Sequence, residues 1–339
     1  MDSLSCEREL GANRCAGVTP ATPDGSDTAF LIAQTKALTA RRRLHGVTSS
    51  SASAAELAAV ARSVAETAAH HVRTRRAELF APTGTRAGEM AVSTKSTPTD
   101  PVTLADTETE TLIRQLLRTQ RPGEKILGEE EGGSVDVPNG VRWVVDPIDG
   151  TVNFMYGIPA YAVSVAAQIN GRSVAGAVVD VARRVTYWAW TDGGAYACAG
   201  TAQEPVGEPV RLRANSIDDV GFALVATGFA YNSQRRAQQG VLMAQLLPRV
   251  RDLRRIGAGA LDLCMVASGA VDAHIEHGLS PWDWAAGGLV AAEAGARVVL
   301  PPADSRSSDG DATIAAAPGI ADDFFAVLDE IGATAPLPD

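Results

Sequence analysis

The stretch VVDPIDGTVNF, residues 144–154, limits the fold of this chain more than any other segment. Its first two residues end the run RWVV, which indicates a buried strand. Asp146 and Asp149 stand at the end of that strand. Two like charges about 4 Å apart repel by roughly 4 kcal/mol at an effective dielectric of 20. Such carboxylates are stable beside a core chiefly when a cation holds them, so the segment predicts a binding site at the end of a core strand.

The spacing of apolar residues predicts alternating helices and strands along most of the chain. Helices are expected at 54–78, 103–120, 237–248, 259–268, 283–294 and 321–332. Strands are expected near the start of 124–133, at 141–147, in a hairpin over 161–181, and at 185–198, 251–256, 271–276, 296–300 and 312–317. The Asn170–Gly171 pair is a strong hairpin turn signal. This order predicts a layered α/β or α+β fold.

A chain of 339 residues permits one large domain or two halves that share a cleft. Residues 1–50 mix Gly, Pro, Ser, Thr and charges without a period, which predicts a flexible N-terminal extension. Order is expected to begin at Ser53, which forms a capping-box pattern with Glu56. The folded domain is predicted to span 51–335, with halves of approximately 51–200 and 201–335.

The formal net charge of −10 argues against general nucleic-acid binding, which depends on clustered basic residues. An anionic substrate remains compatible with this charge, because a bound divalent ion reverses the local field.

The 4 cysteines have no CxxC spacing, which favours reduced thiols and a cytoplasmic protein. The sequence contains no window of 18 uninterrupted apolar residues, so we expect no membrane span. The arginine run in 40–50 precedes a charged, helix-periodic segment, which is not an export signal.

Five acidic residues begin or end predicted elements in a way that could bring them together: Asp106, Glu129, Asp146, Asp149 and Asp283. Singly, each is open to an ordinary explanation as a solvated loop acid or a helix cap. Three of them directly follow apolar strands, which predicts one edge of a sheet, where sites tend to form. The set is rich in oxygen and has no Cys or His at matched spacing, so it favours Mg²⁺ or Mn²⁺ over zinc.

The order Asp-Pro-Ile-Asp-Gly-Thr also has a mechanical interpretation. Pro147 stiffens the chain between the acids, Gly150 permits a sharp turn or a close approach of phosphate, and Thr151 offers a hydroxyl at a helix start. Phosphatases that form an aspartyl-phosphate use Asp-x-Asp-Gly-Thr, but two residues before Asp149 stands Pro147, which is no nucleophile. Attack by a metal-activated water is therefore favoured over a covalent intermediate.

The histidines do not form a pattern that predicts a metal site. His70 and His71 fall on the surface or flank of the helix predicted at 54–78. In HIEH, 274–277, His274 and His277 would face opposite sides of a strand and could not share one ion.

WVVDPIDGTVNF (143–154) and WDWAAGGLVAAEAGA (282–296) resemble the two signature motifs of the inositol monophosphatase family. Three further segments resemble the family in the same order: KSTPTDPVTLAD, ILGEE and RRIGAGALDLCMVASGAVDAHIEHG, at 95–106, 126–130 and 254–278. The resemblance runs from about 55 to 332 and is greatest to actinobacterial members. It implies an αβαβα sandwich of the inositol monophosphatase and fructose-1,6-bisphosphatase type, with 51–335 as the catalytic domain.

The resemblance implies a site for two or three Mg²⁺ ions, with Mn²⁺ as a possible substitute. The first ion would take Glu129, Asp146 and the carbonyl of Ile148. The second would take Asp146, Asp149 and Asp283, and Glu129 could hold a weaker third ion. Glu129 is chosen from the run 129–131 because it directly follows Gly128.

It also implies catalytic and substrate-binding roles. Asp106 and Thr151 would orient the attacking water and help to deprotonate it, with Glu129 as a further catalytic residue. The substrate-binding set would comprise Asp149, Gly150, Thr151, Gly259 and Glu276, of which Gly150 and Thr151 donate N–H groups to phosphate and the others face the inositol ring. Lys95 would be a supporting charge. Gly259 stands where many members have Ala, which loosens the wall beside the sugar slightly.

The expected function is Mg²⁺-dependent hydrolysis of inositol-1-phosphate by a lithium-inhibited homodimer. The alternatives are a histidinol-phosphate, 3′-phosphoadenosine-5′-phosphate or fructose-1,6-bisphosphate phosphatase, or a regulatory binding protein of the same fold that acts in RNA metabolism. Glu276 favours a polyol, whereas a nucleotide would call for basic or aromatic groups near the ring.

Overall fold

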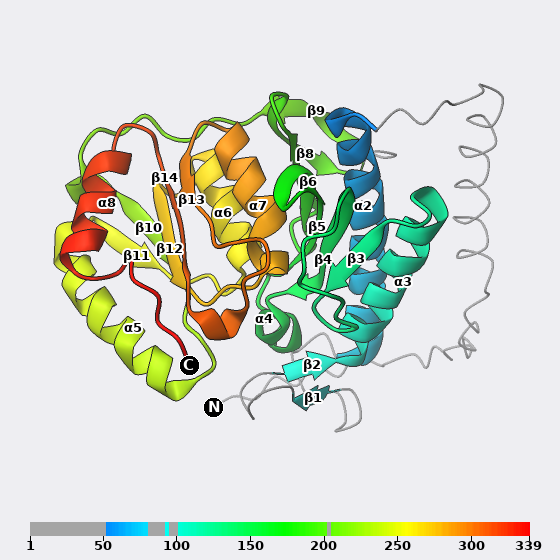
Figure 1. Ribbon diagram of the computed structural model, residues 1–339, viewed down its shortest axis with the longest axis horizontal. Helices are drawn as coiled ribbons and strands as arrows, with labels where there is room; N and C mark the ends of the chain where they lie inside the picture. The colour runs from blue at the N-terminus through cyan, green and yellow to red at the C-terminus, as the bar shows by residue number, and fades with distance from the viewer. Residues whose placement is uncertain (1–51, 81–91, 95–100, 202–204) are drawn as a thin grey trace, which may run out of the picture. The chain divides into compact units, whose positions relative to one another are not determined.

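Two β-sheets face each other across a layer of helices in this computed structural model (Figure 1). The structure describes residues 52–80, 92–94, 101–201 and 205–339. These residues belong to one compact unit, Ser51–Asp339. The extension predicted at 1–50 and the supporting charge Lys95 both lie outside the described residues.

The larger sheet has seven strands, and their order in space follows the chain. They are β3 (Lys125–Gly128), β4 (Val141–Asp149), β5 (Ala162–Ile169), β6 (Arg172–Asp180), β7 (Val185–Trp190), β8 (Gly194–Gly200) and β9 (Pro205–Arg211). Only β3 and β4 pair in parallel; the other neighbours are antiparallel. The parallel pair brings the carboxyl ends of β3 and β4 to the same edge, where the acidic residues follow.

The smaller sheet has five strands in the order β11-β10-β12-β14-β13. They are β10 (Leu224–Thr227), β11 (Asp252–Arg254), β12 (Ala273–His277), β13 (Arg297–Val299) and β14 (Ala312–Ala316). A separate pair joins β1 (Val92–Thr94) to β2 (Pro101–Thr103). Short 3₁₀ turns lie at Val220–Phe222, Leu247–Arg249 and Ser307–Asp309.

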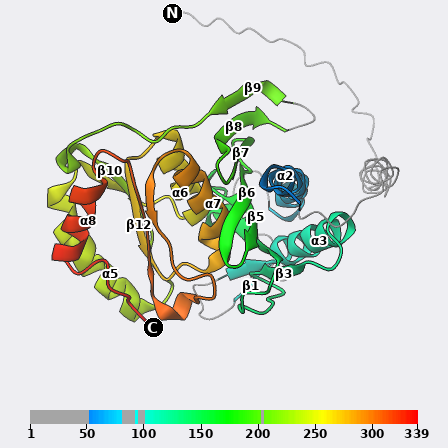
Figure 2. The same ribbon diagram turned by 45° about the horizontal axis from the view of Figure 1, so that its top comes forward.

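Helices form three layers around the two sheets (Figure 1). The outer face of the larger sheet carries α2 (Ala54–Leu79) and α3 (Leu104–Gln120), and Figure 2 shows α2 nearly end-on beside β5 and β6. Between the sheets lie α6 (Gly259–Ser268) and α7 (Pro281–Glu293), while α5 (Ser233–Leu246) and α8 (Ala321–Glu330) cover the smaller sheet. The short α4 (Thr151–Tyr156) follows β4. This arrangement confirms the αβαβα fold expected from the sequence.

Each interface between layers has its own apolar core. Successive residues of β4 serve different cores, since Trp143 packs toward α2 and Val144 toward α6 and α7. A strand covered on both faces needs an unbroken apolar sequence, which explains the run before the acidic pair. Gly176 of β6 lets α7 approach closely, because a Cβ there would lie 3.0 Å from the Cα of Ala286.

Most predicted elements are present, with shifted boundaries. The Ser53–Glu56 capping box and the hairpin turn are confirmed, the latter with φ of 50° at Asn170 and 79° at Gly171. The helix expected from 237 begins at Ser233, because the Asn232 side chain accepts from the N–H groups of the first turn. The strand expected to end at 147 continues through Asp149.

Among the described residues, no helix is both long and apolar enough to cross a membrane.

Candidate active site

A bulge in β4 brings Asp146 and Asp149 together. Residues three apart on a regular strand point to opposite faces. The register with β5 shifts between these two residues, from Asp146 opposite Ser164 to Asp149 opposite Ala162. The extra residue turns the second carboxylate toward the first. The N–H of Ile148 donates to Oδ1 of Asp146 at 3.0 Å and holds this irregular stretch.

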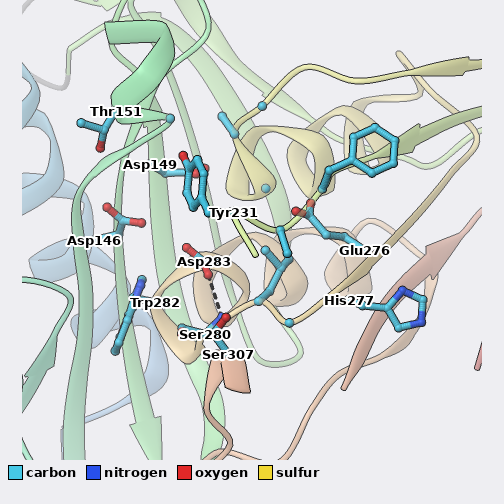
Figure 3. A pocket seen from close by; sticks show the side chains of 18 of the residues that line it. Asp146, Asp149, Thr151, Tyr231, Glu276, His277, Ser280, Trp282, Asp283 and Ser307 are labelled. Atoms are coloured by element: carbon cyan, nitrogen blue, oxygen red, sulfur yellow. Dashed lines mark hydrogen bonds between the residues drawn. The ribbon is translucent and has the colours of Figure 1, made fainter. Parts of the chain in front are cut away.

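Asp283 completes the cluster from the start of α7. Its Oδ2 accepts the N–H of Ser280 at 2.7 Å in a capping box, which fixes the side chain at the helix start. Oxygens of Asp146, Asp149 and Asp283 all lie within 4.8 Å of one another. Figure 3 shows the three carboxylates bordering one space. The sequence therefore predicted correctly that these acids converge.

The electrostatics of this cluster call for a cation. Burial, followed by the charges of Glu129 and the neighbouring aspartates, raises the pKa of Asp146 well above its ordinary value. Burial likewise raises the pKa of Asp149 to about 7, although the N–H of Ala260 donates to Oδ2 at 2.8 Å. The pKa of Asp283 is also raised well above its usual range by burial and by Asp149. Crowded, desolvated carboxylates of this kind fit a hard divalent ion that takes oxygen ligands.

Glu129 is the member of the acidic run that lines the cavity. Because Gly128 pairs with Val145, Glu129 follows at the level of Asp146 on the adjacent strand. The next two residues are held away from the cavity by Glu110, whose carboxylate accepts the N–H groups of Glu130 at 2.6 Å and Glu131 at 3.0 Å.

Glu110 was not among the predicted site residues. It is fully buried on α3 and pairs with Arg114 one turn later at 2.8 Å. The i, i+4 spacing of the two was the available sequence signal, but it is common on solvated helix faces. Only the fold reveals that this pair anchors the loop carrying Glu129.

Gly150 and Thr151 form the junction between β4 and α4. Gly150 has a φ of 90°, and a Cβ there would lie 3.0 Å from the carbonyl oxygen of Ala160. Thr151 is the first residue of α4, as the sequence indicated. Its hydroxyl lies 2.9 Å from Oδ1 of Asp106 and 3.0 Å from the carbonyl oxygen of Ile148.

Asp106 stands behind Thr151 and outside the cavity lining. It is completely buried in the first turn of α3, where the N–H of Thr103 donates to its Oδ2 at 2.9 Å. Burial raises the pKa of Asp106 to about 6, against the lowering effect of the hydrogen bonds from Thr103 and Thr151. The residue is thus placed to accept a proton through Thr151 and not from the cavity directly.

The cavity beside the cluster has a volume of about 620 Å³. All the predicted metal-ligating and substrate-binding residues line it: Glu129, Asp146, Ile148, Asp149, Gly150, Thr151, Gly259, Glu276 and Asp283. Glu276 reaches it from β12, across from the aspartates (Figure 3). Burial and the charge of Asp149 raise the pKa of Glu276 to about 8.

The sequence did not single out several other residues that line the cavity, namely Tyr231, Asn232, Arg235, Arg255 and Trp282. Tyr231, Asn232 and Arg235 lie in or near the first turn of α5, whose start was misplaced. Trp282 lies within the predicted motif before Asp283. The motif was recognised from the neighbouring residues, and nothing in the sequence indicated a role for the indole of Trp282.

A cluster of buried carboxylates beside a cavity, at the strand ends of a two-sheet sandwich, is an arrangement that suits a phosphatase assisted by divalent ions. A model of the inositol monophosphatase family matches residues 53–330. The chain therefore belongs to the inositol monophosphatase family.

Within that family the chain is similar to mycobacterial members. It is 53% identical over 288 residues to the inositol-1-monophosphatase of Mycobacterium leprae, covering 84% of this chain and 97% of the relative. The structure of Mycobacterium tuberculosis SuhB matches with a TM-score of 0.68 and 46% identity, covering 84% of this chain and 99% of the other. The Nus factor SuhB of Pasteurella multocida is 36% identical over 214 residues, covering 63% of this chain and 76% of the relative.

Proposed function

We propose that this protein hydrolyses inositol-1-phosphate to inositol and phosphate with Mg²⁺. One observation supports this most strongly: the oxygens of Asp146, Asp149 and Asp283 cluster on the same cavity that Glu276 reaches from the opposite sheet. A cation site and a hydroxyl acceptor on one cavity suit a phosphorylated polyol. The names of the relatives from Mycobacterium leprae and Mycobacterium tuberculosis, inositol-1-monophosphatase and inositol-1-monophosphatase SuhB, agree with that substrate.

The metal ligands would be the predicted ones. Glu129, Asp146 and the carbonyl of Ile148 would hold one Mg²⁺, and Asp146, Asp149 and Asp283 another, with a weaker third ion at Glu129. Bound Mg²⁺ would neutralise the carboxylates and polarise both the phosphate and the attacking water. We expect Mn²⁺ to substitute and Li⁺ to inhibit.

The protein's own groups would position the water and move its proton. The Thr151 oxygen would accept a hydrogen bond from the water, because its single hydroxyl hydrogen is donated to Asp106. Asp106, with a pKa of about 6, would accept the proton that Thr151 passes on. The N–H groups of Gly150 and Thr151 would hold the phosphate.

Glu276 and Gly259 would set the preference for a polyol. Glu276 would accept hydrogen bonds from ring hydroxyls, and Asp149 would accept another. A Cβ at Gly259 would lie 3.3 Å from the Leu279 side chain, so the glycine lets Leu279 pack closely against the start of α6 at the cavity wall.

A second candidate substrate is a bisphosphorylated nucleotide such as 3′-phosphoadenosine-5′-phosphate. Tyr231 and Arg255 line the cavity and offer the aromatic and basic groups that such a ligand would use. A phosphate-release panel separates the candidates: inositol-1-phosphate, the bisphosphorylated nucleotide, histidinol phosphate and fructose-1,6-bisphosphate at equal concentration. A kcat/KM highest for inositol-1-phosphate supports the proposal, and a higher value for any other ester overturns it.

We further propose a cytoplasmic homodimer, by analogy with the family. The buried, unlinked thiols of Cys198 and Cys264 are compatible with a reducing compartment. Sedimentation equilibrium of the full chain should give twice the mass of 35.2 kDa. A monomer mass at enzyme-assay concentrations would contradict the dimer without affecting the proposed chemistry.

A further inference from the structure

A second group of ionisable side chains lies beside the cavity, separate from the three aspartates. Asp262 on α6 and His274 and Glu276 on β12 each place one ligand atom within 4.8 Å of the others. His274 and Glu276 are two residues apart on a strand and therefore project from the same face. That face packs against α6, which carries Asp262 in its first turn.

Two members of this group, Asp262 and His274, are buried with a relative exposure of 0%. Within the part of the chain that the structure describes, neither oxygen of Asp262 and neither ring nitrogen of His274 has a hydrogen-bond partner. The nearest approach, from Nδ1 of His274 to Oδ2 of Asp262, is 3.9 Å, which is too long for a hydrogen bond. Burying an unpaired carboxylate and imidazole is costly, so a ligand that both can bind would stabilise this arrangement.

The donor set favours a cation as that ligand. Two ligands at the ordinary zinc bond lengths of about 2.0–2.2 Å, in tetrahedral geometry, lie about 3.4 Å apart. The gap between His274 and Asp262 is within about half an ångström of that value, a difference that small side-chain rotations can remove. Imidazole nitrogen with carboxylate oxygen suits zinc and similar transition ions, whereas Mg²⁺ prefers oxygen ligands alone.

Charge supports the same conclusion. A neutral imidazole and deprotonated carboxylates are the forms that bind a metal, and a divalent ion would balance the charges of Asp262 and Glu276 in those forms. Three protein ligands leave a fourth position for water or a substrate group.

We propose that Asp262, His274 and Glu276 form a second metal site, which binds a transition-metal ion of the zinc type. It differs from the oxygen-only cluster of the proposed function both in its residues and in its nitrogen ligand. Glu276 belongs to this site and to the cavity wall, so an ion held here lies next to the substrate space (Figure 3).

The test is zinc retention in the presence of Mg²⁺. Full-length protein is stripped with a chelator, incubated with stoichiometric zinc and a large excess of Mg²⁺, and passed through gel filtration. Zinc is then measured by mass spectrometry. The native protein should retain a single zinc ion per chain, and His274→Phe and Asp262→Asn should each retain less than a tenth of that amount.

Matched controls separate this site from the aspartate cluster. Asp149→Asn should retain the zinc, because Asp149 contributes no ligand to this site. His70→Phe removes an exposed histidine from α2 and should also retain it. Thermal melts establish that each variant is folded; if His274→Phe is not, the nearly isosteric Asp262→Asn decides.

Anomalous diffraction from zinc-treated crystals gives an independent answer. A zinc peak between His274 and Asp262 supports the proposal. The proposal is overturned if native protein retains no zinc, if both variants retain as much as native protein, or if zinc appears only among Asp146, Asp149 and Asp283. None of these outcomes depends on phosphatase activity, so the proposed function stands or fails separately.

Discussion

The hydroxyl of Thr151 donates to Oδ1 of Asp106 across 2.9 Å, and so links the start of α4 to the first turn of α3. This bond crosses the layers of the fold and lies behind the cavity that the aspartates border. Through this bond, the fully buried carboxylate of Asp106 can exchange a proton with the cavity by way of the Thr151 hydroxyl oxygen.

Breaking this relay should abolish most of the activity. Asp106→Asn and Thr151→Val should each lower kcat about 10²- to 10⁴-fold, the usual contribution of a positioned acid–base group. Because both residues move the same proton, the double variant should be little worse than the poorer single variant. Steady-state kinetics with inositol-1-phosphate measures this.

A buried hydroxyl elsewhere on α3 provides the control for the relay. Thr109→Val removes a buried hydroxyl that has no hydrogen-bond partner, and it should keep near-native turnover. Losses that multiply in the Asp106–Thr151 double variant would show that the two residues act independently and would remove the relay from the mechanism.

Removal of divalent ions should inactivate the protein and also destabilise it. Chelation leaves the three clustered carboxylates without a counter-charge, so phosphate release should stop and the melting temperature should fall. Excess Mg²⁺ should restore both, since an ion that binds only the folded state stabilises it by mass action. Phosphatase activity that survives in metal-free buffer would refute the metal-dependent mechanism.

Asp149→Asn should separate catalysis from stability. Loss of groups that merely orient a metal ligand costs about 10- to 100-fold, so loss of a ligand itself should lower activity by at least about 100-fold. The metal-free variant should nevertheless melt at a higher temperature than metal-free native protein, because one of the crowded charges is gone. Native-like turnover in this variant would mean that the reactive centre lies elsewhere.

Much of this fold could be predicted from the sequence, because the core strands are covered on both faces. The three residues before Asp146, at 143–145, are all apolar for that reason, and the turn at Asn170–Gly171 has a strong signal. By contrast, β9 is exposed at each residue, and β10 has only four residues, so neither has a pattern that distinguishes it from a loop.

The sequence indicated many of the residues that line the cavity, but not the geometry that brings them together. The spacing of Asp146 and Asp149 alone implies opposite faces, and only the bulge in β4 reverses this. The approach of Asp262 to His274 depends on how α6 crosses β12, which no local pattern encodes. Glu276 and His274 are two residues apart on β12. This spacing places both side chains on one face of a strand, so their proximity could be predicted from the sequence.

Glu276→Gln should distinguish a polyol site from a general phosphomonoesterase. A buried group left without its hydrogen-bond partner costs about 1–3 kcal/mol, so kcat/KM for inositol-1-phosphate should fall about 5- to 100-fold. Glycerol-2-phosphate has fewer hydroxyls to bind and should be affected less. Equal losses on the two esters, measured in Mg²⁺ buffer without zinc, would leave Glu276 with a structural role only.

The stability of the metal-free protein should depend on pH in a direction that the buried acids determine. Folding raises the pKa of Asp106 to about 6, of Asp149 to about 7 and of Glu276 to about 8, so the folded state holds these protons more tightly than the unfolded chain does. Their contribution to stability is complete below the unfolded pKa values of about 4 and is lost as pH rises through about 6 to 8.

Thermal melts in chelator should therefore show a melting temperature that falls between pH 5 and pH 8, a window taken from roughly the unfolded and folded pKa values. Asp149→Asn should reduce this slope, because it removes one of the titrating groups. Saturating Mg²⁺ should also reduce it, since metal binding requires the deprotonated carboxylates and compensates for their repulsion. A metal-free native protein that becomes more stable across this window, with the same slope in Asp149→Asn, would show that the clustered acids do not govern its stability.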